Sequence, residues 1–140
     1  MNTNQRFAVS LHILTLLAAS DGQLTSESIA DSVDTNPVVI RRTLANLRQQ
    51  GLVESRPGAN GGWRLLNSPK QIRLCEVYRV MGQEAVLALH SHPNKNCRVG
   101  AHIKAALTDV FTVAQTELEK ALDKFTIEDV LNNVLARAGK

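Results

Sequence analysis

Apolar residues recur at helical spacing near the start of the chain. Phe7, Leu11, Leu14 and Leu17 are three or four positions apart, which is the spacing that lines one face of an α-helix. The stretch also carries a basic residue and small residues, as a signal peptide does, but polar residues interrupt it. It is shorter than the roughly 20 apolar residues that cross a bilayer. We therefore expect an amphipathic first helix, with no signal peptide and no membrane contact.

Two shorter helices are predicted next. The first is capped by Thr25 and ends at the sequence DTNP, which spans residues 34–37. The second begins at Pro37, with Asn36 as its cap, and stops at Gly51. Side-chain oxygens satisfy free N–H groups at a helix start, and proline suits the first turn, so both starts follow from local chemistry.

The helix that begins at Pro37 has one apolar side and one basic side. Ile40, Leu44 and Leu47 recur at i, i+4 and i+7 and are expected to face inward. The outward positions are Val38, Arg41, Arg42, Ala45 and Arg48. Two short helices joined by a tight turn, the second with a basic exposed side, are typical of a helix-turn-helix.

A β-hairpin is predicted directly behind these helices. The sequence LVESRPGANGGWRLL gives strands at Leu52–Ser55 and Trp63–Leu66 around a glycine-rich loop. A helix-turn-helix followed by such a hairpin is the winged-helix arrangement. Between Pro37 and Lys70 the chain has six basic residues, and Glu54 is the only acid. This charge favours DNA as the ligand, with an ordinary solvated basic surface as the alternative.

Composition narrows the classes of function. The net charge of +3 is compatible with nucleic-acid binding but is too small to establish it alone. No paired carboxylates, nucleophile elbow or phosphate loop occurs, so an enzyme is not expected. The two cysteines, Cys75 and Cys97, form no disulfide framework, which favours the reducing cytoplasm. Cys75 lies on a predicted helix and is expected to fill the core.

The second half of the chain is predicted to be helical. One helix follows Pro69 and stops at Gly82, and residues 84–90 extend or follow it. A long helix runs from about Cys97 to Leu122, and a final short helix is capped by Thr126. The long helix has an apolar stripe formed by Ile103, Leu107, Val110, Ala114, Leu118 and Ala121. The rest of the domain is too small to cover this stripe, so it suggests a dimer interface, with packing inside the chain as the alternative.

Three segments resemble the Rrf2 family of bacterial winged-helix transcription regulators, and the resemblance extends over nearly the full length. They are GLVESRPGANGGWRL in the wing, LCEVYRVMG in the helix after it, and PNKNCRVG before the long helix. The resemblance implies a mainly α fold with a small β-hairpin wing and a long C-terminal dimerisation helix. Residues 1–82 would form the DNA-binding domain, and residues 83–140 the sensor loop and dimerisation region. The implied function is a homodimeric repressor on a palindromic double-stranded DNA operator.

The expected DNA contacts lie at the start of the second helix, in the first two turns of the third helix, and in the wing. They are Thr25, Ser26, Asn36, Val38, Val39, Arg41, Arg42, Arg56, Gly58, Asn60 and Gly61. An arginine on α-helical base-reading positions can grip guanine through two hydrogen bonds. Thr25 and Ser26 have ordinary capping as an alternative role, and one of the two valines is alternatively core. Trp63 is expected to pack on the inner face of its strand.

The stretch LHSHPNKNCRVGAHI raises the question of a metal or cluster. Family members with an iron–sulphur cluster use three cysteines here, and only Cys97 occupies the segment in this chain. One member has a histidine where this chain has Gly100. A cluster needs about four ligands, so we expect no cluster, no bound metal and no other cofactor. The histidines at 90, 92 and 102 leave a metal-responsive regulator as an alternative.

A reactive thiol is the preferred interpretation of Cys97. The start of a helix favours thiolate, and Arg98 adds positive charge beside it. Cys97 is therefore a candidate redox or electrophile switch, and an unreactive packed thiol is the alternative. A winged-helix module that binds a protein instead of DNA is the alternative for the whole chain.

Overall fold

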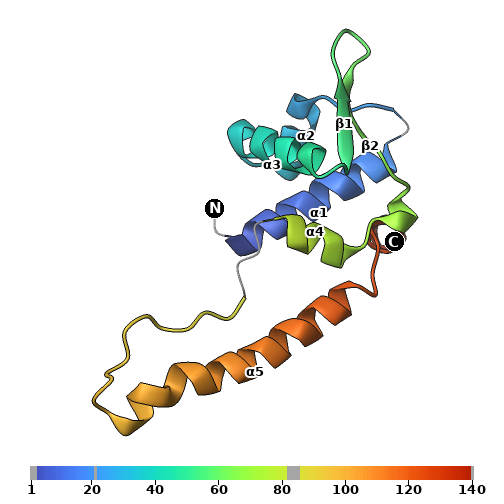
Figure 1. Cartoon of the computed structure of the whole chain (residues 1–140). Helices are drawn as coiled ribbons and strands as arrows, with labels where there is room; N and C mark the ends of the chain where they lie inside the picture. Colours follow the sequence, from blue (N-terminus) through green and yellow to red (C-terminus); the bar gives the residue numbers. More distant parts are fainter. Residues whose placement is uncertain (1–2, 21, 82–85, 140) are drawn as a thin grey trace.

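The computed structural model describes residues 3–20, 22–81 and 86–139. The elements are α1 (Thr3–Ala19), α2 (Ser26–Val33), α3 (Pro37–Gln49), β1 (Val53–Arg56), β2 (Gly62–Leu65), the 3-10 helix η1 (Pro69–Gln71), α4 (Leu74–Val80), α5 (Arg98–Leu122) and α6 (Ile127–Ala138). In Figure 1 the wing, residues 53–65, projects from a head formed by the other short elements, and α5 lies along the far side of the molecule from it. None of the described helices is both long and apolar enough to span a membrane.

An aliphatic core holds the head together. Its fully buried apolar side chains are Ile13, Leu14, Ile29, Ile40, Leu44, Leu47, Leu52, Val53, Ile72, Val77 and Ile127. The polar side chains of α1 that enter this core are satisfied within the helix. The hydroxyl of Ser10 donates to the carbonyl of Arg6 at 2.9 Å, and that of Thr15 donates to the carbonyl of Leu11 at 2.7 Å. The predicted first helix is confirmed, with Leu14 and Leu17 buried and Phe7 and Leu11 half-buried.

Both predicted caps of the helix pair are confirmed. The hydroxyl oxygen of Thr25 accepts the N–H of Ser28 at 3.1 Å. The side-chain oxygen of Asn36 accepts the N–H of Val38 at 2.8 Å. Asp34 ends α2 in the left-handed conformation, with φ of 56°. Because all these contacts are local, the chain direction between α2 and α3 is set by a few adjacent residues.

The two strands pair antiparallel, with Val53 opposite Leu65 and Arg56 opposite Gly62. β1 begins and ends one residue later than predicted, and β2 one residue earlier. A further backbone pairing was not expected: the N–H of Trp63 donates to the carbonyl of Leu24 at 2.7 Å, and the reverse bond is 3.1 Å. This pairing attaches β2 to the segment that leads into α2.

The C-terminal helix α6 returns to the head and lies against α1 and η1. The N–H of Ile127 donates to the carbonyl of Ile72 at 2.9 Å, and the Ile127 side chain is fully buried. The predicted cap at Thr126 is confirmed as a capping box with Asp129. The head is therefore built from both ends of the chain.

The segment after α4 differs from the prediction. α4 ends at Val80, and the expected stop at Gly82 and the expected domain boundary between 82 and 83 lie outside the described residues. Residues 86–90 contain no helix, so a helix there was wrong. The N–H of Val86 donates to the side chain of Gln115 at 3.4 Å, so this backbone bonds to α5 instead of to its own next turn.

The long helix α5 contacts the head mainly through its C-terminal half. The side-chain amide of Gln115 donates to the hydroxyl of Tyr78 at 2.7 Å, and Arg79 pairs with Glu119 at 3.1 Å. None of the described residues of α5 is buried. Val110 of the predicted stripe is 59% exposed, whereas Ile103, Leu107 and Leu118 are half-buried, so the apolar side of the helix is only partly covered within one chain.

Candidate nucleic-acid interface

The outward face of α3 carries unpaired positive charge. Arg41 and Arg42 are exposed, and neither forms an ion pair with a described carboxylate. Val38 is 47% exposed beside them, whereas Val39 is half-buried. Asn36 is exposed, but its side-chain oxygen caps the helix. The first turns of α3 therefore present two free guanidinium groups and one apolar side chain to solvent.

The start of α2 lies in a capped, partly exposed turn. Thr25 is exposed and uses its oxygen to cap the helix, as its alternative role required. The hydroxyl of Ser26 lies 3.4 Å from the carboxylate of Glu27 and donates to it. Both hydroxyls are therefore engaged locally, and the backbone N–H groups of this first helical turn are the remaining donors for a phosphate.

The wing loop carries the other predicted contacts. Arg56, Gly58 and Asn60 are all exposed. The N–H of Gly61 donates to the carbonyl of Gly58 at 3.0 Å and closes the turn. Arg56 therefore stands at the base of a tight exposed loop, with no described carboxylate paired to it.

Gly62, opposite Arg56 at the loop end of the strands, is required by the pairing of β2 with Leu24. Its φ is +139°, and a Cβ at this position would lie 2.6 Å from the carbonyl oxygen of Leu24. Only glycine fits such a conformation and such a close backbone approach without strain. The glycine-rich sequence of the wing thus serves the attachment of the wing as well as its turn.

Fewer basic side chains are left unpaired than the sequence suggests. Glu54 lies opposite Arg64 in the hairpin, and the two side chains form an ion pair. The only acid between Pro37 and Lys70 therefore offsets one of the six basic residues. The charges left for a nucleic acid are concentrated on α3 and at Arg56.

Sequence reasoning missed the contact of Arg48 with Trp63. Trp63 is half-buried on the inner side of its strand, as expected, but the guanidinium of Arg48 also lies over its ring. The sequence did hold a signal for this contact, because the hairpin begins directly after α3 and must fold back across the last turn of that helix.

Cys97 was predicted in the first turn of the long helix, but α5 begins one residue later, at Arg98, and Cys97 is its exposed N-cap. The backbone N–H groups of Gly100 and Val99 lower the pKa of its thiol below the ordinary value of 9.0, although the sulfur makes no close capping hydrogen bond. The helix start, and not the neighbouring arginine, is the cause of this shift. By contrast, burial raises the pKa of the Cys75 thiol, which lies in the core as predicted.

The loop before α5 gathers no metal site. Among the residues that the structure describes, no group of three or more histidine, cysteine or acidic side chains is placed to hold an ion. Gly100 lies against the backbone of Asn94, and a Cβ there would clash with its carbonyl oxygen. A histidine at position 100 does not fit this conformation of the loop.

The helix pair α2–α3 and the wing behind it define a winged helix-turn-helix protein, and the predicted fold class is confirmed. The model of the Rrf2 family, described as "Iron-dependent Transcriptional regulator", matches residues 3–133. The chain belongs to the Rrf2 family, as the resemblance implied. It is a helix-turn-helix transcriptional regulator and not an enzyme.

Relatives agree with this assignment. YwnA of Bacillus subtilis (strain 168), provisionally named an HTH-type transcriptional regulator, is 42% identical over 132 residues, covering 94% of this chain and 98% of the relative. A crystal structure of a provisionally named DNA-binding protein is similar at a TM-score of 0.74 and 38% identity, covering 90% of this chain and 98% of that one. IscR of T. potens has a similar fold, with a TM-score of 0.73 at 23% identity, covering 96% of this chain and 88% of that one.

The family description names iron, but the residues present do not fit an iron–sulphur cluster. Such clusters are held mainly by several cysteine thiolates. Here Cys97 is exposed at the start of α5, and Cys75 is buried in the head. The described residues around them form no ligand set.

Proposed function

We propose that this regulator is a sequence-specific repressor that reads double-stranded DNA with the first turns of α3 and holds the backbone with the wing. The exposed and unpaired Arg41 and Arg42 carry the proposal. In helix-turn-helix proteins the start of the second helix reaches base edges in the major groove. Val38 would meet a thymine methyl, while Arg56 and Asn60 in the wing would contact the backbone.

The backbone donors at the start of α2 complete the proposed footprint. Thr25 caps the first turn of that helix and Asn36 caps the start of α3, and the N–H groups around Thr25 and Ser26 would donate to a phosphate. Gly58 and Gly61 let the wing backbone approach the duplex closely. Val39, which is half-buried, would contribute at the edge of this surface.

The proposed active form is a homodimer that is joined through α5. Val110 and Ala114 of the apolar stripe are exposed within one chain, while Ile103, Leu107 and Leu118 are half-buried. A second copy of the same helix would cover the exposed part. Two heads related by a two-fold axis would read a palindromic operator, whose half-sites match the separation of the two α3 helices.

Binding to DNA fragments of the promoter region tests the interface. The double variant Arg41→Ala, Arg42→Ala should lose most of its affinity for the selected operator and show a weaker dependence on salt. The matched control is Lys124→Ala, Arg137→Ala, which removes the same charge from the opposite part of the head. If both double variants bind as tightly as the unchanged protein, α3 does not read DNA, and a protein-binding role for this face is favoured.

The oligomeric state in solution tests the proposed homodimer. Val110→Glu places a charge in the open stripe and should convert the dimer to a monomer in sedimentation equilibrium. Thr112→Glu, on the opposite side of the same helix, should leave the dimer intact. A Val110→Glu protein that sediments as a dimer would show that α5 is not the interface.

We further propose that Cys97 adjusts DNA binding in response to oxidants or electrophiles. Its exposure and its lowered thiol pKa support this role. With N-ethylmaleimide the sulfur adds to the ring double bond, and the thiol proton ends on the adjacent carbon. Treatment should change the operator affinity of the unchanged protein and not that of Cys97→Ser. An equal change in both proteins would refute the switch.

A further inference from the structure

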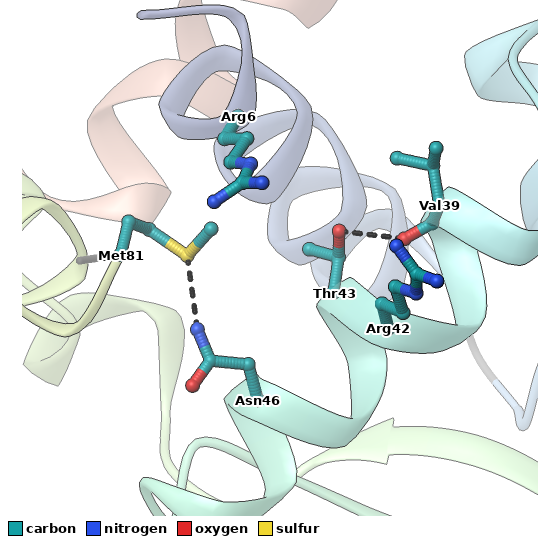
Figure 2. Close-up of a pocket in the computed structure, with 6 residues that line it drawn as sticks. All are labelled: Arg6, Val39, Arg42, Thr43, Asn46 and Met81. Carbon is teal, nitrogen blue, oxygen red and sulfur yellow. Dashed lines mark hydrogen bonds between the residues drawn. The ribbon is translucent and has the colours of Figure 1, made fainter. Parts of the chain in front are cut away.

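A pocket of about 270 Å³ opens where α1, α3 and the end of α4 meet. The described residues that line it are Arg6, Val39, Arg42, Thr43, Asn46 and Met81. Figure 2 shows the pocket, with Arg6 reaching in from α1 and the α3 residues along the other side. None of these lining residues carries a carboxylate.

The inner polar groups of the pocket are satisfied by the protein itself. The hydroxyl of Thr43 donates to the carbonyl of Val39 at 2.8 Å. The side-chain amide of Asn46 donates to the carbonyl of Val80 at 3.2 Å. It also approaches the sulfur of Met81 at 3.6 Å (Figure 2). Thr43 and Met81 are buried, so the inner wall is already fixed before any ligand arrives.

The two guanidinium groups of the pocket are not satisfied in this way. Neither Arg6 nor Arg42 forms an ion pair with a described carboxylate, although each arginine lines the same small space. Guanidinium groups bind carboxylates through paired charge-assisted hydrogen bonds. Val39 and Met81 add apolar surface beside them. The combination of two free cations with a short apolar wall suits a small organic acid.

We propose that this pocket binds a small aliphatic carboxylate, with its charged group between Arg6 and Arg42 and its apolar body against Val39 and Met81. A bare inorganic anion or a DNA phosphate would use the arginines alone. The apolar contacts with Val39 and Met81 would therefore favour organic acids over inorganic anions and DNA phosphates.

Occupation of the pocket would also act on DNA binding, and this part rests on the function proposed above. Arg42 belongs to both surfaces, because it is exposed on α3 and also lines the pocket. A carboxylate that holds Arg42 draws its charge away from the duplex. The bound acid thus lowers operator affinity without touching the wing.

Methyl NMR of the full chain tests the binding step without DNA. Isovalerate is the probe, its neutral amide isovaleramide is the uncharged control, and inorganic phosphate is the anion without an apolar body. We expect isovalerate to shift the methyl signals of Val39 and Met81 saturably, and the two controls to shift them little. Equal binding of the amide, stronger binding of phosphate, or no saturable shift would overturn the proposal.

A charge variant identifies the site. Arg6→Gln should weaken isovalerate binding about tenfold, since one charge-assisted hydrogen-bonding group is lost. Arg98→Gln removes an exposed arginine far from the pocket and should leave the titration unchanged. If Arg6→Gln binds isovalerate as the unchanged protein does, the acid does not occupy this pocket.

The effect on DNA is measured separately. Isovalerate should weaken operator binding of the unchanged protein and have less effect on Arg6→Gln. If isovalerate binds but no DNA is bound under any condition, the pocket stands and the proposed function fails. If Arg6→Gln loses DNA affinity while isovalerate never binds, the arginine is a phosphate contact and the pocket proposal fails.

Discussion

The guanidinium carbon of Arg48 lies 5.6 Å from the centre of the Trp63 ring, and this contact joins the last turn of α3 to the wing. A cation over an aromatic face is attracted by the negative charge of the ring face. α3 and the wing are thus linked by a side-chain contact as well as by the chain between them.

Breaking this contact should loosen the wing slightly. In a double-mutant cycle with Arg48→Ala and Trp63→Leu, we expect a coupling free energy of unfolding of about 0.5–1 kcal/mol. Arg48→Ala should also change the emission of Trp63, which is the only tryptophan of the chain. Arg41→Ala, on the same helix, is the control and should leave the emission unchanged. A coupling of zero would mean that the two side chains are merely adjacent.

Gly62, which lies against the carbonyl of Leu24, gives a second prediction. Gly62→Ala should destabilise the protein by about 1–3 kcal/mol, because it forces an L-residue into a strained conformation against the Leu24 carbonyl. Urea denaturation followed by circular dichroism measures the loss. Gly22→Ala is the matched control, since nothing lies within 4 Å of its position for a Cβ. Equal stability of the two variants would contradict the close backbone approach.

The N-terminal cap of α6 gives a third prediction. Thr126→Ala removes one half of the capping box and should cost about 1 kcal/mol of unfolding free energy. Thr116→Ala, in the middle of α5, makes the same chemical change where the hydroxyl donates only to the carbonyl of Thr112. It should be neutral or slightly stabilising in the same denaturation experiment. A larger loss at 116 than at 126 would show that the cap does not hold α6.

The two cysteines should differ in their response to pH. Because the pKa of Cys97 is lowered, its thiolate fraction grows at lower pH, and alkylation by iodoacetamide should reach half its maximal rate below pH 9.0. Burial raises the pKa of Cys75, so this thiol should stay unmodified across the same range until the protein is unfolded. Mass spectrometry of the modified peptides measures each rate. A midpoint for Cys97 above pH 9.0 would contradict the effect of the helix start.

Local chemistry explains what the sequence could predict. The caps at Thr25, Asn36 and Thr126 were found because a cap depends on residues within four positions of it. The outward face of α3 followed from its period, which leaves Arg41 and Arg42 opposite the buried side.

Relationships between distant segments were not predictable in the same way. The pairing of Leu24 with Trp63 depends on how the wing folds over α1, which no local pattern encodes. The ion pair of Glu54 with Arg64 was not predicted, although the bounds of each strand moved by one residue without a change of the hairpin register. The pocket at Arg6 and Arg42 needs α1 and α3 to meet, so periodicity placed both arginines on helix surfaces without bringing them together.

The return of α6 to the head has a consequence for synthesis on the ribosome. Ile127 is fully buried in the same core as Ile72, yet it is made only after all of α5. A nascent chain that already contains α3 and the wing therefore still lacks part of its core. The head therefore reaches full stability only after α5 has been made and Ile127 of α6 has joined the core.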